Sequence, residues 1–456
     1  MVRTQPVSIR EAIPVWVRVA LHSFGGPAGQ IAVMHRVLVE EKRWIPESRF
    51  LHALNFCMLL PGPEAQQLAT YIGWLLNSTI GGLVAGCLFV LPGFLSILGL
   101  SLLYALFQGA APLQAIFFGI KPAVLAIVVE ALIRIGRRAL RSGVMAAIAG
   151  MAFFAIFFLE LPFPLIILSA ALLGFVGNRL RPRGSLTPRA PRQEDHGDVA
   201  TEVDSVIAPG GGEPVRPTIG RALRILAICL ALWFGPLAVI ALCDGRDNIY
   251  IREGLLFSKA AVLTFGGAYA VLAYVAQEVV NVHGWLSPRE MLDGLGMAET
   301  TPGPLIQVVQ FVGFMGAYRS PGNLPPLVAA TLGAILTTWV TYVPCFLWIF
   351  LGAPYVEILR RKRALAAALS SITAAVVGVM LNLSIWFTLH TLFATVDEVR
   401  THGLRWLVPA WRSLDPASAL IAAAALVARL RFRIGMFPTL FGSAALGLVY
   451  RLLLCP

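Results

Sequence analysis

Long apolar runs, separated by short polar stretches, occupy most of this chain. Runs such as residues 80–106 exceed the roughly 20 residues that an α-helix needs to cross the hydrocarbon core of a bilayer. They do not show the short alternating segments that are typical of membrane β-barrels. The pattern therefore predicts an all-α polytopic membrane protein.

The apolar pattern predicts six helical elements in each half of the chain. In the first half they are residues 12–34, 51–76, 80–106, 113–135, 144–159 and 162–176. In the second half they are residues 260–279, 291–317, 324–351, 365–392, 417–430 and 437–454. One further element, residues 222–242, has no counterpart in the first half.

The stretch between the halves has a different composition. Residues 178–220 are rich in proline, glycine and charge and have almost no large apolar side chains, so they cannot bury a core. We expect a disordered linker there. It would follow an N-terminal repeat, 1–177, and precede a linking transmembrane helix, 221–243, and a C-terminal repeat, 244–456.

Short motifs recur between the halves at constant spacing. F-G-G at 24–26 returns at 265–267, and P-G-P at 61–63 returns at 302–304, in both cases 241 residues later. Four more residues keep this spacing: Trp44 with Trp285, and Gln66 with Gln307. A later set is 252 residues apart: Pro92 with Pro344, and segment 119–130 with segment 371–382. These colinear matches indicate an internal duplication.

The unpaired element determines how the two copies face the membrane. The copy of each element comes seven elements later, and an odd shift turns the copy upside down, as in the inverted repeats of many secondary transporters. Either thirteen elements cross the membrane, or nine cross and the four that contain F-G-G or P-G-P turn back as re-entrant hairpins. The second arrangement is favoured because these motifs lie within their elements.

The distribution of charged residues predicts how the chain is oriented across the membrane. Only 13% of residues are charged, against about 25% in soluble proteins, and the formal net charge is +12. Basic clusters follow apolar runs at 134–141, in the linker, at 360–363 and at 429–433. The positive-inside rule then places the N-terminus and the linker of this multi-pass protein in the cytoplasm. Such clustering indicates topology rather than nucleic-acid binding.

The interrupted elements form the candidate binding site. Proline ends one helix and starts another well, and irregular backbone at membrane depth is tolerated only where protein or a cavity satisfies it. New helix ends offer unpaired N–H groups to an anion. Kinks or close packing are the alternative, but both breaks occur in both halves. The expected oxyanion-binding residues are Ser23, Phe24, Gly25, Gly26, Pro61, Gly62, Pro63, Gln66, Lys121, Thr264, Phe265, Gly266, Gly267, Thr301, Pro302, Gly303, Pro304 and Gln307.

Two ionisable residues stand out because their counterparts are not charged. Glu64 follows the first P-G-P directly, where the second half has Leu305. It is a candidate proton-coupling residue, or it stabilises a helix N-terminus. Lys121, whose counterpart is Thr373, is a fixed positive charge near an anion path or a lysine that snorkels. The spacing of cysteines and histidines indicates no metal site, and no cofactor is expected.

These motifs together resemble the chromate ion transporter family in its long two-domain form. The resemblance is carried by S-F-G-G-P-A-G-Q-I-A at 23–32, E-E-K-R-W-I at 40–45, L-P-G-P-E-A-Q-Q-L at 60–68, F-G-G-A-Y-A-V-L at 265–272 and T-P-G-P at 301–304. It implies export of chromate, for which sulfate is a close structural analogue. It does not imply particular ligand residues, which come from the repeat alone.

The expected function is therefore a membrane transporter that exports chromate from the cytoplasm, driven by the membrane potential, a proton gradient or both. A transporter of sulfate or another oxyanion is the alternative, and a membrane-embedded transferase is a third reading without a nucleophile–base or metal motif behind it. The expected partners are a chromate- or sulfate-like oxyanion and the lipid bilayer. A homodimer remains open, and no nucleic acid is expected.

Overall fold

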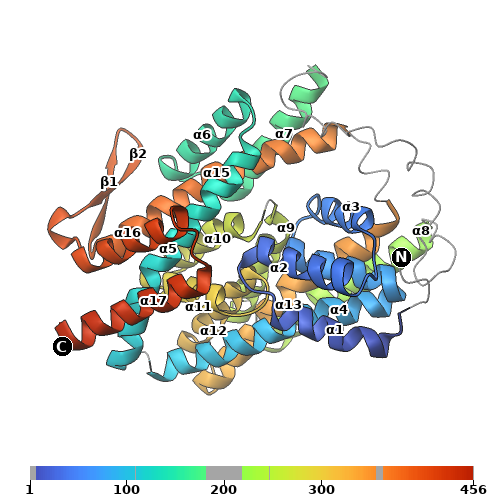
Figure 1. Cartoon of the computed structure of the whole chain (residues 1–456), viewed down its shortest axis with the longest axis horizontal. Helices are drawn as coiled ribbons and strands as arrows, with labels where there is room; N and C mark the ends of the chain where they lie inside the picture. The colour runs from blue at the N-terminus through green and yellow to red at the C-terminus, as the bar shows by residue number, and fades with distance from the viewer. Residues whose placement is uncertain are drawn as a thin grey trace.

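The computed structural model describes residues 7–107, 109–180, 218–245, 247–265, 267–355 and 363–454. Most of the predicted linker, Gly266 and most of the basic cluster at 360–363 lie outside these residues. The described chain is almost entirely helical, and Figure 1 shows long helices packed side by side. The predicted all-α membrane class is confirmed.

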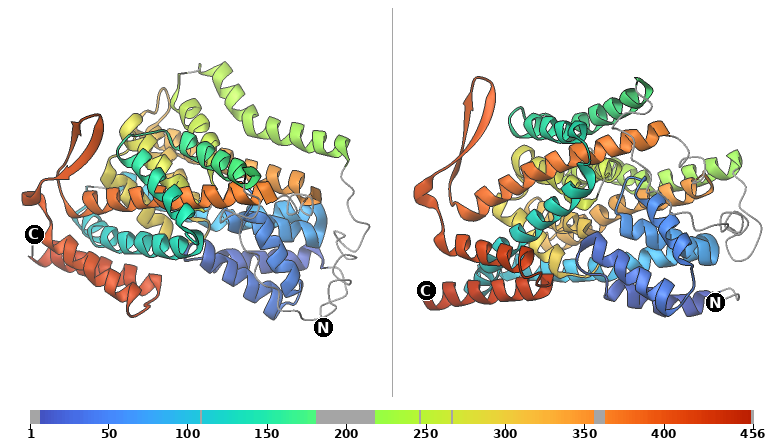
Figure 2. Two further views of the ribbon diagram at one scale, coloured as in Figure 1. Left: turned by 90° about the horizontal axis from the view of Figure 1, so that it is seen from above. Right: turned by 45° about the horizontal axis from the view of Figure 1, so that its top comes forward.

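The first half contains the following elements: α1 (Ile9–Leu21), α2 (Gly26–His35), a π-helical turn η1 (Arg36–Glu41), α3 (Glu47–Cys57), α4 (Glu64–Phe107), α5 (Ala111–Ala139), α6 (Gly143–Phe157) and α7 (Phe163–Leu180). Helix α8 (Ile219–Cys243) follows, and Figure 2 shows it along the outside of the bundle.

The second half begins with α9 (Ile249–Leu263), α10 (Ala268–Ala276), η3 (Gln277–Val282), α11 (Pro288–Thr300), η4 (Leu305–Gln307) and α12 (Val308–Arg319). It continues with α13 (Pro326–Gly352), η5 (Ala353–Tyr355), α15 (Arg363–Leu392), β1 (Val396–Thr401), β2 (Leu404–Pro409) and η6 (Trp411–Ser413). The described chain ends with α16 (Pro416–Leu430), α17 (Met436–Val449) and η7 (Tyr450–Leu454).

Five of these helices are long and apolar enough to cross a membrane: α4, α5, α8, α13 and α15. Helices α6, α7, α16 and α17 are apolar but shorter. Large apolar side chains remain exposed on the outer surface. In α8, for example, Leu242 is 87% exposed and Ile219 is 78% exposed. Such a surface is stable against lipid rather than water.

The predicted boundary between the second and third elements is confirmed. The range of α4 spans it, but Asn77 and Ser78 leave helical geometry, and Ser78 has a φ of 55°. Two helices therefore meet at a sharp kink within α4, and they pack closely there, since a Cβ on Gly73 would lie 2.4 Å from the Gly81 carbonyl oxygen. The element expected to begin at residue 260 instead begins at Ile249, because the Asn248 side chain accepts a hydrogen bond from the Ile251 amide and caps α9.

A β-hairpin that the sequence analysis did not predict follows α15. Strands β1 and β2 pair antiparallel, with Thr401 opposite Leu404. His402 and Gly403, at the turn, both have positive φ, as a two-residue hairpin turn of this kind requires. The sequence analysis did not identify these strands, because they carry several charged side chains and their apolar and polar residues do not alternate regularly.

Arg405 holds this hairpin against the α6–α7 connection. Its side chain is 5% exposed, pairs with Glu160 at 3.0 Å and donates to the Phe157 carbonyl at 3.2 Å. We expect Arg405→Gln to release the hairpin, because it removes the hydrogen bonds that a buried guanidinium makes to Glu160 and to the Phe157 carbonyl, each worth about 1.5–3 kcal/mol. Hydrogen exchange of residues 396–409 measures this. Arg400→Gln is the control: Arg400 also pairs with Glu160, but its side chain is 70% exposed, so little change is expected.

Helices of one half pack against helices of the other. Helix α5 packs against α16 and α17, while α15 packs against α6 and α7. Glycine permits this close approach: a Cβ on Gly119 of α5 would lie 2.0 Å from the Ser443 carbonyl oxygen of α17. A Cβ on Gly378 of α15 would lie 2.1 Å from the Ala149 carbonyl oxygen of α6. The two halves are therefore interlocked.

Candidate functional site

The chain leaves helical geometry at all four predicted motifs. Helix α1 ends at Leu21 and α2 begins at Gly26, so the S-F-G-G motif at 23–26 spans the connection and the first residue of α2. Helix α3 ends at Cys57 and α4 begins at Glu64, just after the first P-G-P. In the second half, T-F-G-G separates α9 from α10, and P-G-P separates α11 from η4.

The four motifs are joined across the halves by two hydrogen bonds, which we call the crossed pair. The Gly62 amide donates to the Thr264 carbonyl at 2.8 Å. The Gly303 amide donates to the Ser23 carbonyl at 2.9 Å. Gly62 and Gly303 are 241 residues apart, as are Ser23 and Thr264, so the second bond repeats the first with the halves exchanged.

Each P-G-P also contacts a long helix of the opposite half beside an internal proline. A Cβ on Gly62 would lie 3.0 Å from Cys345 Sγ, which follows Pro344 in α13. A Cβ on Gly93, which follows Pro92 in α4, would lie 2.6 Å from the Pro302 carbonyl oxygen. Gly93 and Cys345 are 252 residues apart, the second repeat spacing.

The F-G-G glycines begin α2 and α10. Gly25, Gly26 and Gly267 have φ values of 82°, 69° and 104°, which favour glycine. A Cβ on any of the three would meet nothing within 4 Å. Neither α2 nor α10 has a side-chain N-cap hydrogen bond. The starts of both helices therefore face open space.

The predicted hydroxyl groups are already used by their own helices. Ser23 Oγ donates to the Val19 carbonyl at 2.6 Å, and Thr264 Oγ1 donates to the Ala260 carbonyl at 2.6 Å. Thr301 Oγ1 donates to the Ala298 carbonyl at 3.4 Å. Each hydroxyl bonds a carbonyl in the last turn of its own helix, and the Val19 carbonyl also accepts from the His22 amide at 3.3 Å. In this conformation they help to end helices.

Buried glutamines surround the motifs. Gln66 is fully buried and donates through Nε2 to Thr70 Oγ1 at 3.1 Å. Gln307 is 2% exposed and accepts from the Tyr342 hydroxyl at 2.7 Å. Gln30 of α2 donates to the Gly303 carbonyl at 2.5 Å, so it joins α2 to the second P-G-P. Gln66 and Gln307 were predicted, whereas Gln30 was not.

Sequence reasoning missed Gln30 because its counterpart in the second half, Val271, is apolar. It also missed Gln310, whose Nε2 donates to the Phe94 carbonyl of α4 at 3.0 Å, and Tyr342. A polar side chain within two turns of a predicted break was the available signal for both glutamines.

The remaining predicted residues shape the same region. The Phe24 ring packs edge-on against Phe437 of α17, with centroids 5.0 Å apart, and Phe265 packs against the main hydrophobic core. Pro61 accepts a hydrogen bond from Gln67 Nε2 at 2.7 Å. The backbone at Pro63 accepts from the Gln67 amide, and that at Pro304 from the Gln307 amide. Glu64 is half-buried at the first residue of α4.

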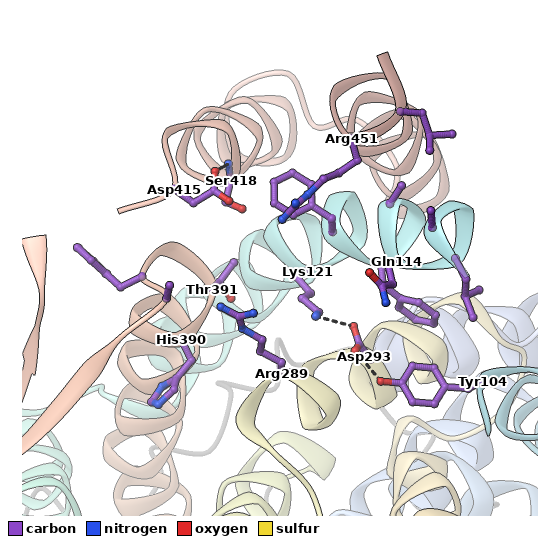
Figure 3. Close-up of a pocket in the computed structure, with 18 residues that line it drawn as sticks. Tyr104, Gln114, Lys121, Arg289, Asp293, His390, Thr391, Asp415, Ser418 and Arg451 are labelled. Carbon is purple, nitrogen blue, oxygen red and sulfur yellow. Dashed lines mark hydrogen bonds and ion pairs between the residues drawn. The ribbon is translucent and has the colours of Figure 1, made fainter. Parts of the chain in front are cut away.

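Lys121 lies apart from the motifs. Its Nζ is 3.0 Å from Asp293 Oδ1 of α11, and both side chains line a cavity of about 800 Å³ (Figure 3). Asp293 precedes Thr301 by eight residues, or about 12 Å of helix. The predicted positive charge is thus paired with the middle of the helix that leads to the second P-G-P.

Interrupted helices that meet inside a bundle of membrane-spanning helices define a class: polytopic proteins that build a ligand site from discontinuous helices. A family model described as chromate transporter matches residues 11–175 and again residues 253–448. The chain belongs to the chromate transporter family, and the resemblance noted from the motifs is confirmed.

The relatives include full-length and short proteins. A chromate transport protein of Pseudomonas aeruginosa is 30% identical over 382 residues, which cover 82% of this chain and 80% of that protein. A chromate transport protein of Cupriavidus metallidurans is 26% identical over 379 residues, 83% of this chain and 82% of that protein. An uncharacterized transporter of Bacillus subtilis, YwrB, is 27% identical over 152 residues, 33% of this chain and 76% of that protein. No solved structure matches the chain.

Proposed function

We propose that this protein exports chromate, or a similar tetrahedral oxyanion such as sulfate, from the cytoplasm. The observation that carries the proposal is the crossed pair. The F-G-G and P-G-P motifs, which carry the resemblance to the family, are joined across the two halves by this pair of hydrogen bonds. Relatives named chromate transport proteins supply the substrate class.

The halves form an inverted repeat. Three sets of contacts support a two-fold relation between the halves, and the odd shift of seven elements makes that relation an inversion. The contacts are the crossed pair at the 241-residue spacing, the Gly93 and Cys345 contacts at the 252-residue spacing, and the exchanged packing of α5 and α15. In each set, exchanging the two halves reproduces the same kind of contact. The proposed units are residues 1–177 and 244–456, joined by a linker, 178–220, and a linking helix, 221–243.

The arrangement in the membrane has nine crossings and four re-entrant elements. Nine crossings correspond to the second part of α4 together with α5, α6, α7, α8, α13, α15, α16 and α17. The four interrupted elements enter from either side and meet inside the bundle. The arginines at 134–141 and 429–433 then lie in the cytoplasm with the N-terminus and the linker, in a bacterial inner membrane.

The anion binds where α2 and α10 begin. The support is the open space before Gly25, Gly26 and Gly267 and the absence of a side-chain cap there. The unpaired backbone N–H groups and the positive ends of the helix dipoles favour a dianion. Gln66 has a second Nε2–H to donate. Gly62 and Gly303 hold the halves together through the crossed pair, and the prolines and phenylalanines of the motifs form the walls.

The membrane potential favours export of an anion. Against an inside-negative potential, each exported charge gains about 2.3 kcal/mol per 100 mV, so a dianion gains roughly twice that. Uptake of labelled chromate and labelled sulfate into everted vesicles tests the proposal. Saturable uptake that exceeds that of vesicles without the protein is expected. Uptake confined to right-side-out vesicles would show that the direction is wrong, and absence of uptake in both would reject the function.

Glu64→Gln tests proton coupling. If Glu64 exchanges a proton during the cycle, the variant should transport with little dependence on pH, whereas the wild type should depend on it. Initial rates in everted vesicles across a pH series measure this. Glu11→Gln in the first turn of α1 is the matched control, because it neutralises a carboxylate away from the motifs. An unchanged pH profile in Glu64→Gln leaves export driven by the potential alone.

A further inference from the structure

We infer that the cavity beside Lys121 is a second oxyanion site, at the end of the transport path opposite the cytoplasm. The inference rests on the proposed function for its ligand and its orientation. The cavity has a volume of about 800 Å³ and is lined by α4, α5, α11, α15, α16 and η7 together with the start of the segment after α15 (Figure 3).

Three cations reach this cavity from three different elements. They are Lys121 of α5, Arg289 of α11 and Arg451 of η7. Within the described chain, neither Arg289 nor Arg451 makes an ion pair, and the Arg451 guanidinium lies over the Phe118 ring, 4.6 Å from its centroid. These positive groups therefore have charge to offer to a ligand.

The two acidic groups in the lining are already engaged. Asp293 is 6% exposed, pairs with Lys121 and accepts from the Tyr104 hydroxyl at 3.0 Å. Asp415 caps α16 by accepting from the amides of Ala417 and Ser418 at 3.0 and 3.1 Å. With the three cations against two occupied carboxylates, the net charge of the lining is positive.

The size of the cavity determines how an anion is held. At about 30 Å³ per water molecule, 800 Å³ holds about 25 waters, far more than a tetrahedral oxyanion displaces. The anion is therefore bound with much of its hydration shell, by charge more than by shape. Lys121 has N–H groups left after its bond to Asp293, and Arg289 presents a planar fork suited to two oxygens of one anion. Tyr104 and Asp293 are positioning residues for Lys121.

The position of the cavity explains its use. Its lining includes the end of α15, the start of α16 and η7. Figure 1 shows the β-hairpin, α16 and the C-terminal end of the chain on the opposite side of the molecule from α1 and α3. In the proposed orientation this end faces outward. Asp293 lies on α11, whose far end leads to the second P-G-P. An oxyanion leaving the motifs would therefore meet these cations before reaching bulk solvent.

Equilibrium binding of labelled sulfate and of chromate to the purified full-length protein, at low and high ionic strength, tests the site. Arg289→Gln should weaken binding about fivefold at low ionic strength and less at high ionic strength, because surface charges are screened. Lys121→Gln with Asp293→Asn removes the buried pair together, so that no unpaired charge is left, and should weaken binding as well. Arg412→Gln is the matched control, an exposed arginine of η6 outside the lining.

Binding as tight as that of the wild type in both Arg289→Gln and the Lys121→Gln, Asp293→Asn double variant would overturn the site. A wild-type protein that binds neither anion would also overturn it, and so would a loss in Arg412→Gln equal to the loss in Arg289→Gln. Transport in vesicles separates this inference from the proposed function. Binding that depends on Arg289 in a protein without oxyanion flux keeps the site and rejects the transporter. Normal flux with binding that ignores Arg289 and Lys121 keeps the transporter and rejects the site.

Discussion

Gly26→Leu is expected to abolish oxyanion transport while the protein still inserts and folds. Gly26 begins α2 with a φ of 69°, and a Cβ there meets nothing within 4 Å. A leucine side chain therefore enters the open space where the anion is proposed to bind, without a clash. The left-handed backbone costs about 1–2 kcal/mol, which a packed bundle tolerates. Uptake in everted vesicles and the amount of protein in the membrane measure the two effects.

Gly322→Leu is the matched control for this substitution. Gly322 has a φ of 60° and equally open surroundings, but it lies in the connection between α12 and α13. The backbone strain is therefore similar and the site is untouched, so normal transport is expected. Full activity in Gly26→Leu would remove the start of α2 from the transport path. Equal inactivity in Gly322→Leu would show that strain alone explains the loss.

Gly93→Val is expected to disrupt the contact between α4 and the second P-G-P. Its Cβ would lie 2.6 Å from the Pro302 carbonyl oxygen and 3.5 Å from the Gly303 Cα, which are backbone atoms that cannot rotate away. Overpacking of this kind costs about 1–3 kcal/mol, sometimes more. The displaced Gly303 amide would also lose Ser23. Thermal unfolding in detergent should show a lower midpoint, and transport should be lost.

Gly99→Val provides the comparison within the same helix. Gly99 lies in α4 less than two turns beyond Gly93, and a Cβ there meets nothing within 4 Å. Both substitutions place the same β-branched residue in a helix, so any difference reports the contact with P-G-P. A midpoint for Gly93→Val equal to that of Gly99→Val would mean that the second P-G-P moves aside freely.

Much of the fold could be predicted because long, continuous apolar runs in a sequence predict membrane helices. The repeat spacing also identified Ser23, Gly62, Thr264 and Gly303 as residues that belong together. It could not tell that their amides and carbonyls bond to each other, because the direction of each backbone group depends on the geometry of the turn. For the same reason the sequence could not tell that the hydroxyl groups of Ser23, Thr264 and Thr301 donate to carbonyls at the ends of their own helices.

The cavity beside Lys121 could not be predicted from the chain. Its cations come from α5, α11 and η7, whose residues are far apart in the sequence and match no repeat spacing. Lys121 was noticed only because its counterpart, Thr373, is neutral. Asp293 was not predicted as a site residue, because the residues adjacent to it in the sequence do not indicate that it pairs with Lys121 of another helix.

The crossed pair has a consequence for how such a protein can be divided. The Gly62 amide finds its acceptor on Thr264 and the Gly303 amide finds its own on Ser23, so neither half is complete alone. A shorter polypeptide that resembled one half only, such as the relative that matches 152 residues or 33% of this chain, would have to take the missing carbonyl from a second polypeptide. In a fused chain the two halves are linked covalently, whereas separate subunits would first have to associate.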